Sequence, residues 1–137
     1  MSDILLVGLS PRSDDGKEFF LHCGDYWVDI LEVIYALTDK VFPAENYMFR
    51  DSWLSPPTPH LDGDGALILS AQIERIIKNG SAREHLENYY RTDPLQVEYF
   101  NGVEEHLVET ANERLRQLEE LGLFLESSGG CKANWSY

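Results

Sequence analysis

Short apolar runs and longer apolar stripes divide the chain into its predicted elements. The first apolar runs are residues 3–9 (DILLVGL) and 19–23 (FFLHC), and a polar segment with Pro and Gly separates them. Short runs bounded by turn residues are typical of β-strands. We therefore expect an N-terminal hairpin.

A stripe of apolar residues with helical spacing follows the hairpin. It consists of Trp27, Ile30, Leu31, Ile34 and Leu37. Apolar residues three and four positions apart share one face of an α-helix, so the stripe predicts a largely buried helix over residues 26–38. Asp25 precedes this stripe and is of the residue type that caps helix N-termini.

The stretch HLDGDGALILSAQIERI (60–76) has two aspartates around a glycine, followed by an apolar stripe. A calcium-binding loop does not fit, because neither Asp62 nor His60 as the first ligand leaves suitable oxygen ligands at the later positions. Helix initiation fits better. Asp64 is placed to accept hydrogen bonds from the free N–H groups of a helix that ends at Gly80.

Two more helix starts follow. Residues 81–84 (SARE) have the spacing of a capping box. Asp93-Pro94 combines an N-cap residue with proline at the first helical position. The segment that follows, 95–100 (LQVEYF), is ambiguous because its apolar residues also alternate as in a strand. We favour a helix that is interrupted near residues 101–102 (NG), and the strand stays open as the alternative.

The longest apolar stripe predicts a helix over residues 103–126. Its buried face consists of Leu107, Ala111, Leu115, Leu118 and Leu125. The sequence SSGG at 127–130 is a stop signal for this helix. Residues 131–136 then predict a final short strand, added at an edge of the sheet.

Together these elements predict a single domain over residues 1–137 with an α+β fold. About four helices pack together, and the N-terminal hairpin and C-terminal strand form a small sheet on one side. A length of 137 residues and an apolar content of 43% suit a domain that buries its own core. The irregular segment 39–65 is rich in proline and aromatic residues, which predicts an ordered loop.

Composition adds a strong negative charge to this picture. The chain has 24 Asp and Glu against 11 Lys and Arg, a formal net charge of −13. Such a surface repels nucleic acid and anionic membranes and attracts a basic protein. On the long helix, Glu105, Glu109, Glu113 and Glu120 form an outward-facing stripe suited to docking such a partner. Solubility alone explains the charge equally well.

Known catalytic and metal-site patterns do not occur in the sequence. The four histidines lack HxxxH and HExxH spacing, the two cysteines lack CxxC spacing, and there is no GxSxG or P-loop motif. We therefore expect no metal, no cofactor and no catalytic residue. The absence of a signal peptide and of any run of 18 apolar residues predicts a cytoplasmic protein without a membrane segment.

Two functions remain open at this point. The first is a non-catalytic acidic bacterial protein that binds a basic protein partner, for example an immunity protein against a toxin. The second is a small-molecule binder or an enzyme that uses the loop 43–65. That site has Trp53 as an apolar wall and His60, Asp62 and Asp64 as its polar groups. The sequence predicts neither the oligomeric state nor the identity of the partner or ligand.

Two stretches, DGDGALILSAQIERII (62–77) and LGLFLESSGGCKAN (121–134), resemble a group of small uncharacterised bacterial domains. In that group a GDG element precedes an amphipathic helix, and a later helix runs into an F-x-x-S-G-G element and a terminal strand. Trp27 in DYWVDILEV matches an early Trp of the group. The resemblance covers about half of the chain. It implies a small α+β fold and carries over no catalytic residue.

Overall fold

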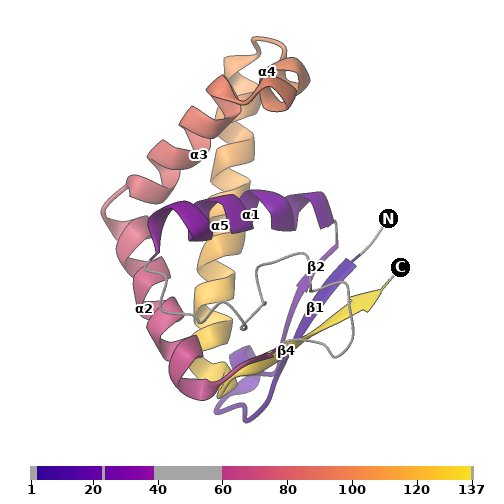
Figure 1. Ribbon diagram of the computed structural model, residues 1–137, viewed down its shortest axis with the longest axis vertical. Helices are drawn as coiled ribbons and strands as arrows, with labels where there is room; N and C mark the ends of the chain where they lie inside the picture. The colour runs from indigo at the N-terminus through magenta and orange to yellow at the C-terminus, as the bar shows by residue number, and fades with distance from the viewer. Residues whose placement is uncertain (1–2, 23, 39–59, 137) are drawn as a thin grey trace.

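A computed structural model of the chain describes residues 3–22, 24–38 and 60–136. The helices in these ranges are α1 (Gly24–Leu37), α2 (Gly63–Lys78), α3 (Ser81–Thr92), α4 (Pro94–Phe100) and α5 (Glu104–Ser128). The strands are β1 (Asp3–Gly8), β2 (Glu18–Leu21), β3 (His60–Leu61) and β4 (Cys131–Ser136), and a 3-10 turn, η1 (Asp14–Gly16), joins β1 to β2. Figure 1 shows α5 running the length of the molecule, with α1 crossing it and the sheet at one end.

The strands form one antiparallel sheet in the order β2-β1-β4-β3. β1 pairs with β2 as the predicted hairpin, and on its other side it pairs with β4. The prediction that residues 131–136 form an edge strand of the sheet is wrong for the first two residues of β4. The extended residues of β3, just before α2, pair with Cys131 and Lys132 on the outer side. The α+β fold itself is confirmed.

The start of α2 confirms helix initiation in the GDG stretch but changes the capping residue. Asp62 is the N-cap, and its Oδ1 accepts a hydrogen bond of 2.7 Å from the backbone N–H of Gly65. The prediction that Asp64 caps this helix is wrong, because α2 begins at Gly63 and Asp64 lies in its first turn. An acidic side chain there still favours the positive end of the helix.

Of two other predicted helix starts, the structure confirms one. The capping box at residues 81–84 is not formed, since Ser81 is already helical and its backbone N–H donates to Asn79 Oδ1 at 2.9 Å. At Asp93-Pro94 the prediction is confirmed, because the Asp93 carboxylate accepts from the backbone N–H of Gln96. Segment 95–100 is therefore helix and not strand. Helix α1 begins at Gly24, so residue 25, the predicted N-cap position, lies inside the helix.

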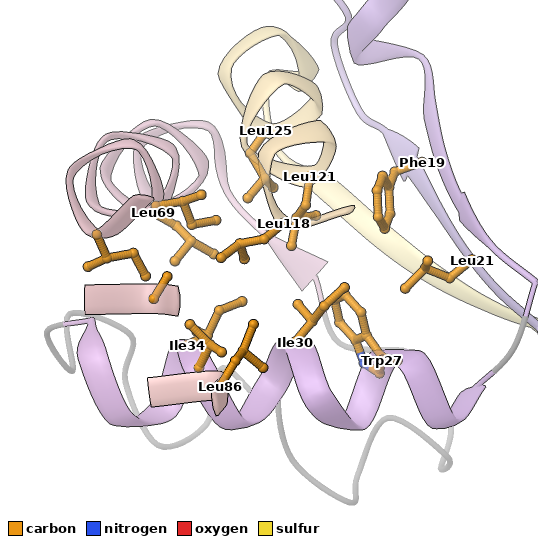
Figure 2. Close-up of a cluster of buried hydrophobic side chains, with 14 of the residues drawn as sticks. Phe19, Leu21, Trp27, Ile30, Ile34, Leu69, Leu86, Leu118, Leu121 and Leu125 are labelled. Atoms are coloured by element: carbon orange, nitrogen blue, oxygen red, sulfur yellow. The ribbon is translucent and has the colours of Figure 1, made fainter. Parts of the chain in front are cut away.

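The core lies where the sheet and four helices meet. Figure 2 shows side chains from these elements converging on one cluster, in which all the labelled residues are buried. They are Phe19 and Leu21 from β2, Trp27, Ile30 and Ile34 from α1, Leu69 from α2, Leu86 from α3, and Leu118, Leu121 and Leu125 from α5. Burying each of these side chains contributes about 1.5–3 kcal/mol, so this cluster is the main source of stability.

Gly122 brings α2 and α5 into close contact. The helix does not end there but continues to Ser128. A Cβ atom at Gly122 would lie 3.2 Å from Ile73 Cγ2, so glycine allows the two helices to approach. The buried Ser70 hydroxyl donates to the Gly122 carbonyl at 2.8 Å. These two contacts hold α5 close against α2.

The end of α5 is held by the loop after β1. Backbone N–H groups of Ser10 and Arg12 donate to the carbonyls of Ser128 and Ser127, which have no partner inside the helix. The η1 turn packs against the same place. A Cβ atom at Gly16 would lie 2.1 Å from the Ser127 carbonyl oxygen, which explains why the turn has glycine here.

Candidate functional site

The predicted acidic stripe is present on the outer face of α5. Glu105, Glu109, Glu113 and Glu120 are all exposed, and Glu119 extends the same face. We call these five residues the α5 ridge. Residues 105 to 120 span about 22 Å of helix at the usual rise. The ridge therefore presents a long row of carboxylates on a helix that the core holds in place.

One cation lies within the ridge. Arg116 Nε donates to Glu113 Oε2 at 3.2 Å, and Arg116 also pairs with Glu120. The hydrogen bond from Arg116 lowers the pKa of Glu113. No cation among the described residues pairs with Glu105, Glu109 or Glu119. Those three carboxylates are the part of the ridge that can attract a basic partner.

A groove of about 590 Å³ opens beside the ridge, between α1, α4 and α5. Glu109 and Glu113 belong both to the ridge and to the wall of this groove. The other walls are largely apolar and come from α1 and α4, the helix farthest from the sheet in Figure 1. These apolar walls include Tyr26, Val28, Leu95 and Tyr99. We call this cavity the α4 groove.

The apolar wall of the α4 groove is unusually open to solvent. Leu95 is 74% exposed, Tyr99 66% and Val28 54%. Tyr99 is held in place by ring contacts with Phe100 and His106, at centroid distances of 5.0 and 5.5 Å. Large apolar side chains gathered around a cavity and left exposed are typical of an interaction site.

A buried polar network forms the floor of the α4 groove. The side chains of Arg114 and Asp29 are only 7% and 14% exposed, and Arg114 Nε lies 3.4 Å from Asp29 Oδ2. Arg114 Nη1 donates to Gln117 Oε1 at 2.8 Å. The Arg114 guanidinium also lies over the Tyr26 ring, 3.6 Å from its centroid.

Tyr90 completes this network from α3. Its hydroxyl donates to Asp29 Oδ2 at 2.7 Å. Burial and the negative charge of Asp29 raise the pKa of Tyr90 well above its usual range, so the hydroxyl stays protonated and keeps donating. The network therefore ties α1, α3 and α5 together and gives the groove a fixed floor.

The alternative pocket in loop 43–65 gains no support from the described residues. Asp62 is used as the cap of α2, and Asp64 is exposed in the first turn of that helix. The backbone of His60 pairs with Lys132 in the sheet. Trp53 lies outside the described residues. Neither aspartate lines the α4 groove.

No group of three or more His, Cys, Asp or Glu in the described ranges is arranged to hold a metal ion. Cys131 is fully buried, and burial raises the pKa of its thiol to about 12. A thiol that stays protonated is a poor nucleophile, so Cys131 is not suited to covalent catalysis. Within the same ranges, no helix is both long and apolar enough to cross a membrane.

The α5 ridge was predictable from the sequence, and the α4 groove was not. One signal was present. Arg114 falls on the apolar face of the predicted long helix, between Ala111 and Leu118. A charged residue at a core position requires a buried partner. That partner, Asp29, lies far away in the sequence and was not identified.

Comparisons of the chain with protein-family models, with curated proteins and with solved structures found no match. The resemblance of residues 62–77 and 121–134 to a bacterial domain family therefore stays a prediction.

Proposed function

We propose that this protein is a non-catalytic binding protein whose α5 ridge docks a basic protein partner. The observation that carries the proposal is the row of exposed carboxylates, in which Glu105, Glu109 and Glu119 have no cation partner among the described residues. These side chains extend from a helix whose opposite face is buried in the core. Docking onto such a surface requires little ordering of the backbone.

Charge supports this function in two ways. A net charge of −13 attracts a basic partner and speeds the encounter, and the effect weakens with salt. Close charge pairs across an interface have measured coupling energies of about 1.5–7 kcal/mol. The same charge disfavours nucleic acid and anionic membranes as partners.

The narrower form of the proposal is a cytoplasmic bacterial immunity protein that neutralises a basic toxin. Small size and an acidic surface suit that role. A toxin with a basic cleft, such as a nuclease, has the complementary charge.

The test compares two variants with the same change in charge. The ridge variant is Glu105→Gln/Glu109→Gln/Glu119→Gln. The control variant, Asp64→Asn/Glu84→Gln/Glu98→Gln, changes exposed acidic residues of α2, α3 and α4 that do not belong to the ridge. Each variant and the unmodified protein are used as bait in a lysate of the source cells, with elution at low and then high salt.

We expect a basic protein to be retained by the unmodified protein and by the control variant, and to be released by salt. The ridge variant should lose it. Equal retention by the ridge variant, or binding that does not change with salt, would show that the ridge is not the docking surface.

A further inference from the structure

The structure also indicates how such a partner is held after charge has brought it close. Resting on the function proposed above, we propose that the α4 groove receives an amphipathic helix of the basic partner. Apolar side chains of that helix enter between α1 and α4, and its Lys or Arg side chains pair with the ridge.

The first support is the arrangement of the apolar wall. Leu95 and Tyr99 are four positions apart on α4, so both point to the same side of that helix. Val28 lies across the groove on α1. All three are more than half exposed. Covering them would remove apolar surface from water on both sides of the bound segment.

The second support is the charge of the remaining wall. Glu109 and Glu113 line the groove from α5. The arginine that also lines it, Arg114, is buried and engaged by Asp29 and Gln117. Glu113 is paired with Arg116, so an occupant meets apolar side chains on one side and, on the other, the Glu109 carboxylate, which no described cation pairs with. A basic amphipathic helix has the matching pattern.

The third support is size and rigidity. About 590 Å³ lies within the range of binding cavities and accepts several apolar side chains. A helix that binds in a groove inserts residues at about i, i+3 or i+4, and i+7. The Arg114–Asp29–Tyr90 network fixes the floor before binding. A pre-formed groove reduces the entropy cost of association.

Two synthetic peptides of equal positive charge serve as probes. The first is a Leu/Lys peptide patterned to form an amphipathic helix, and the second has Ser in place of every Leu. Binding is measured by fluorescence anisotropy, and the contact surface by amide chemical-shift changes. The groove variant is Val28→Ala/Leu95→Ala. The matched control is Leu123→Ala, which truncates a 51% exposed residue of α5 that does not line the α4 groove.

We expect the Leu/Lys peptide to bind about ten-fold more tightly than the Ser/Lys peptide, since burial of apolar groups adds to charge attraction. The groove variant should lose most of that difference, and the Leu123→Ala control should keep it. Shifts should concentrate on α1 and α4 around Val28 and Leu95.

Three results would overturn the inference. They are equal affinity for the two peptides, unchanged Leu/Lys binding by the groove variant, and no binding of either peptide. If the two peptides bind with equal affinity and the shifts lie along the α5 ridge, the inference fails but the proposed function stands, because charge alone is then sufficient for binding. Failure of the proposed function itself is decided separately, by retention of a basic protein on the ridge variant.

Discussion

The Arg114–Asp29 pair under the α4 groove permits a quantitative test of the structure. We consider the substitution Arg114→Met, which keeps an unbranched side chain of similar helix propensity and removes the guanidinium group with its charge. The change leaves the Asp29 carboxylate, only 14% exposed, without its cation. Tyr90 still donates one hydrogen bond to it.

The expected loss of stability follows from that environment. Removing one partner of a buried ion pair costs about 3–5 kcal/mol, because the remaining charge stays desolvated. The Tyr90 hydrogen bond and the residual exposure of Asp29 offset part of this, so we expect about 3 kcal/mol. Asp29→Asn should also destabilise, because it leaves Arg114 buried without a counter-charge. The double variant should be destabilised by about 2 kcal/mol less than the sum of the single variants.

The assay is urea unfolding followed by circular dichroism on the four members of this cycle. Arg116→Met is the matched control, since Arg116 lies two positions along α5 with a side chain that is 57% exposed. Its ion pairs with Glu113 and Glu120 are at the surface, so its loss should cost less than about 1 kcal/mol. A coupling energy below about 0.5 kcal/mol for the Arg114 and Asp29 substitutions would refute the buried pair as an energetic unit.

Three further predictions concern other parts of the fold. Asp62→Ala should lower the free energy of unfolding by about 1 kcal/mol through loss of the α2 cap, and Asp64→Ala by only a few tenths, as measured by urea unfolding. Gly16→Ala should destabilise by about 1–3 kcal/mol, because its Cβ would meet the Ser127 carbonyl; an unchanged melting temperature would contradict that close contact. The pKa of Cys131 is raised from 9.0 to about 12, so the thiol ionises first in the unfolded chain as pH rises. Its contribution to stability is therefore complete below about pH 9 and is lost above it by up to about 1.4 kcal/mol per pH unit. Unfolding of Cys131→Ala should be less sensitive to alkaline pH, and identical slopes would contradict the burial.

The elements that the sequence predicted well are those with a local signal. The apolar stripe of α5 and the Asp93-Pro94 start of α4 depend on residues a few positions apart, and both are confirmed. The cap of α2 was assigned to the wrong residue for a physical reason. Asp62 and Asp64 both precede the same stripe, and only the backbone geometry selects Asp62.

The candidate site was predictable only in part. The ridge follows from helical spacing on α5, and its four predicted glutamates are exposed in the structure. The α4 groove depends on the crossing of α1 over α5, which brings Val28 near Leu95. No sequence spacing encodes that approach. The sequence also did not predict that Leu95 is exposed, because an apolar residue on a short helix is usually expected to be buried.

The pairing of β1 with β4 has a consequence for the kinetics of folding. Every residue pair in this ladder, from Asp3–Ser136 to Gly8–Cys131, joins positions nearly the whole chain apart. The contacts between α2, α3 and α4 are, by contrast, between neighbours in sequence. Closing a long loop costs entropy before any contact repays it, and proteins with many distant contacts fold slowly. We therefore expect α2, α3 and α4 to form their mutual contacts first and the closure of the β1–β4 ladder to set the rate at which the native state appears.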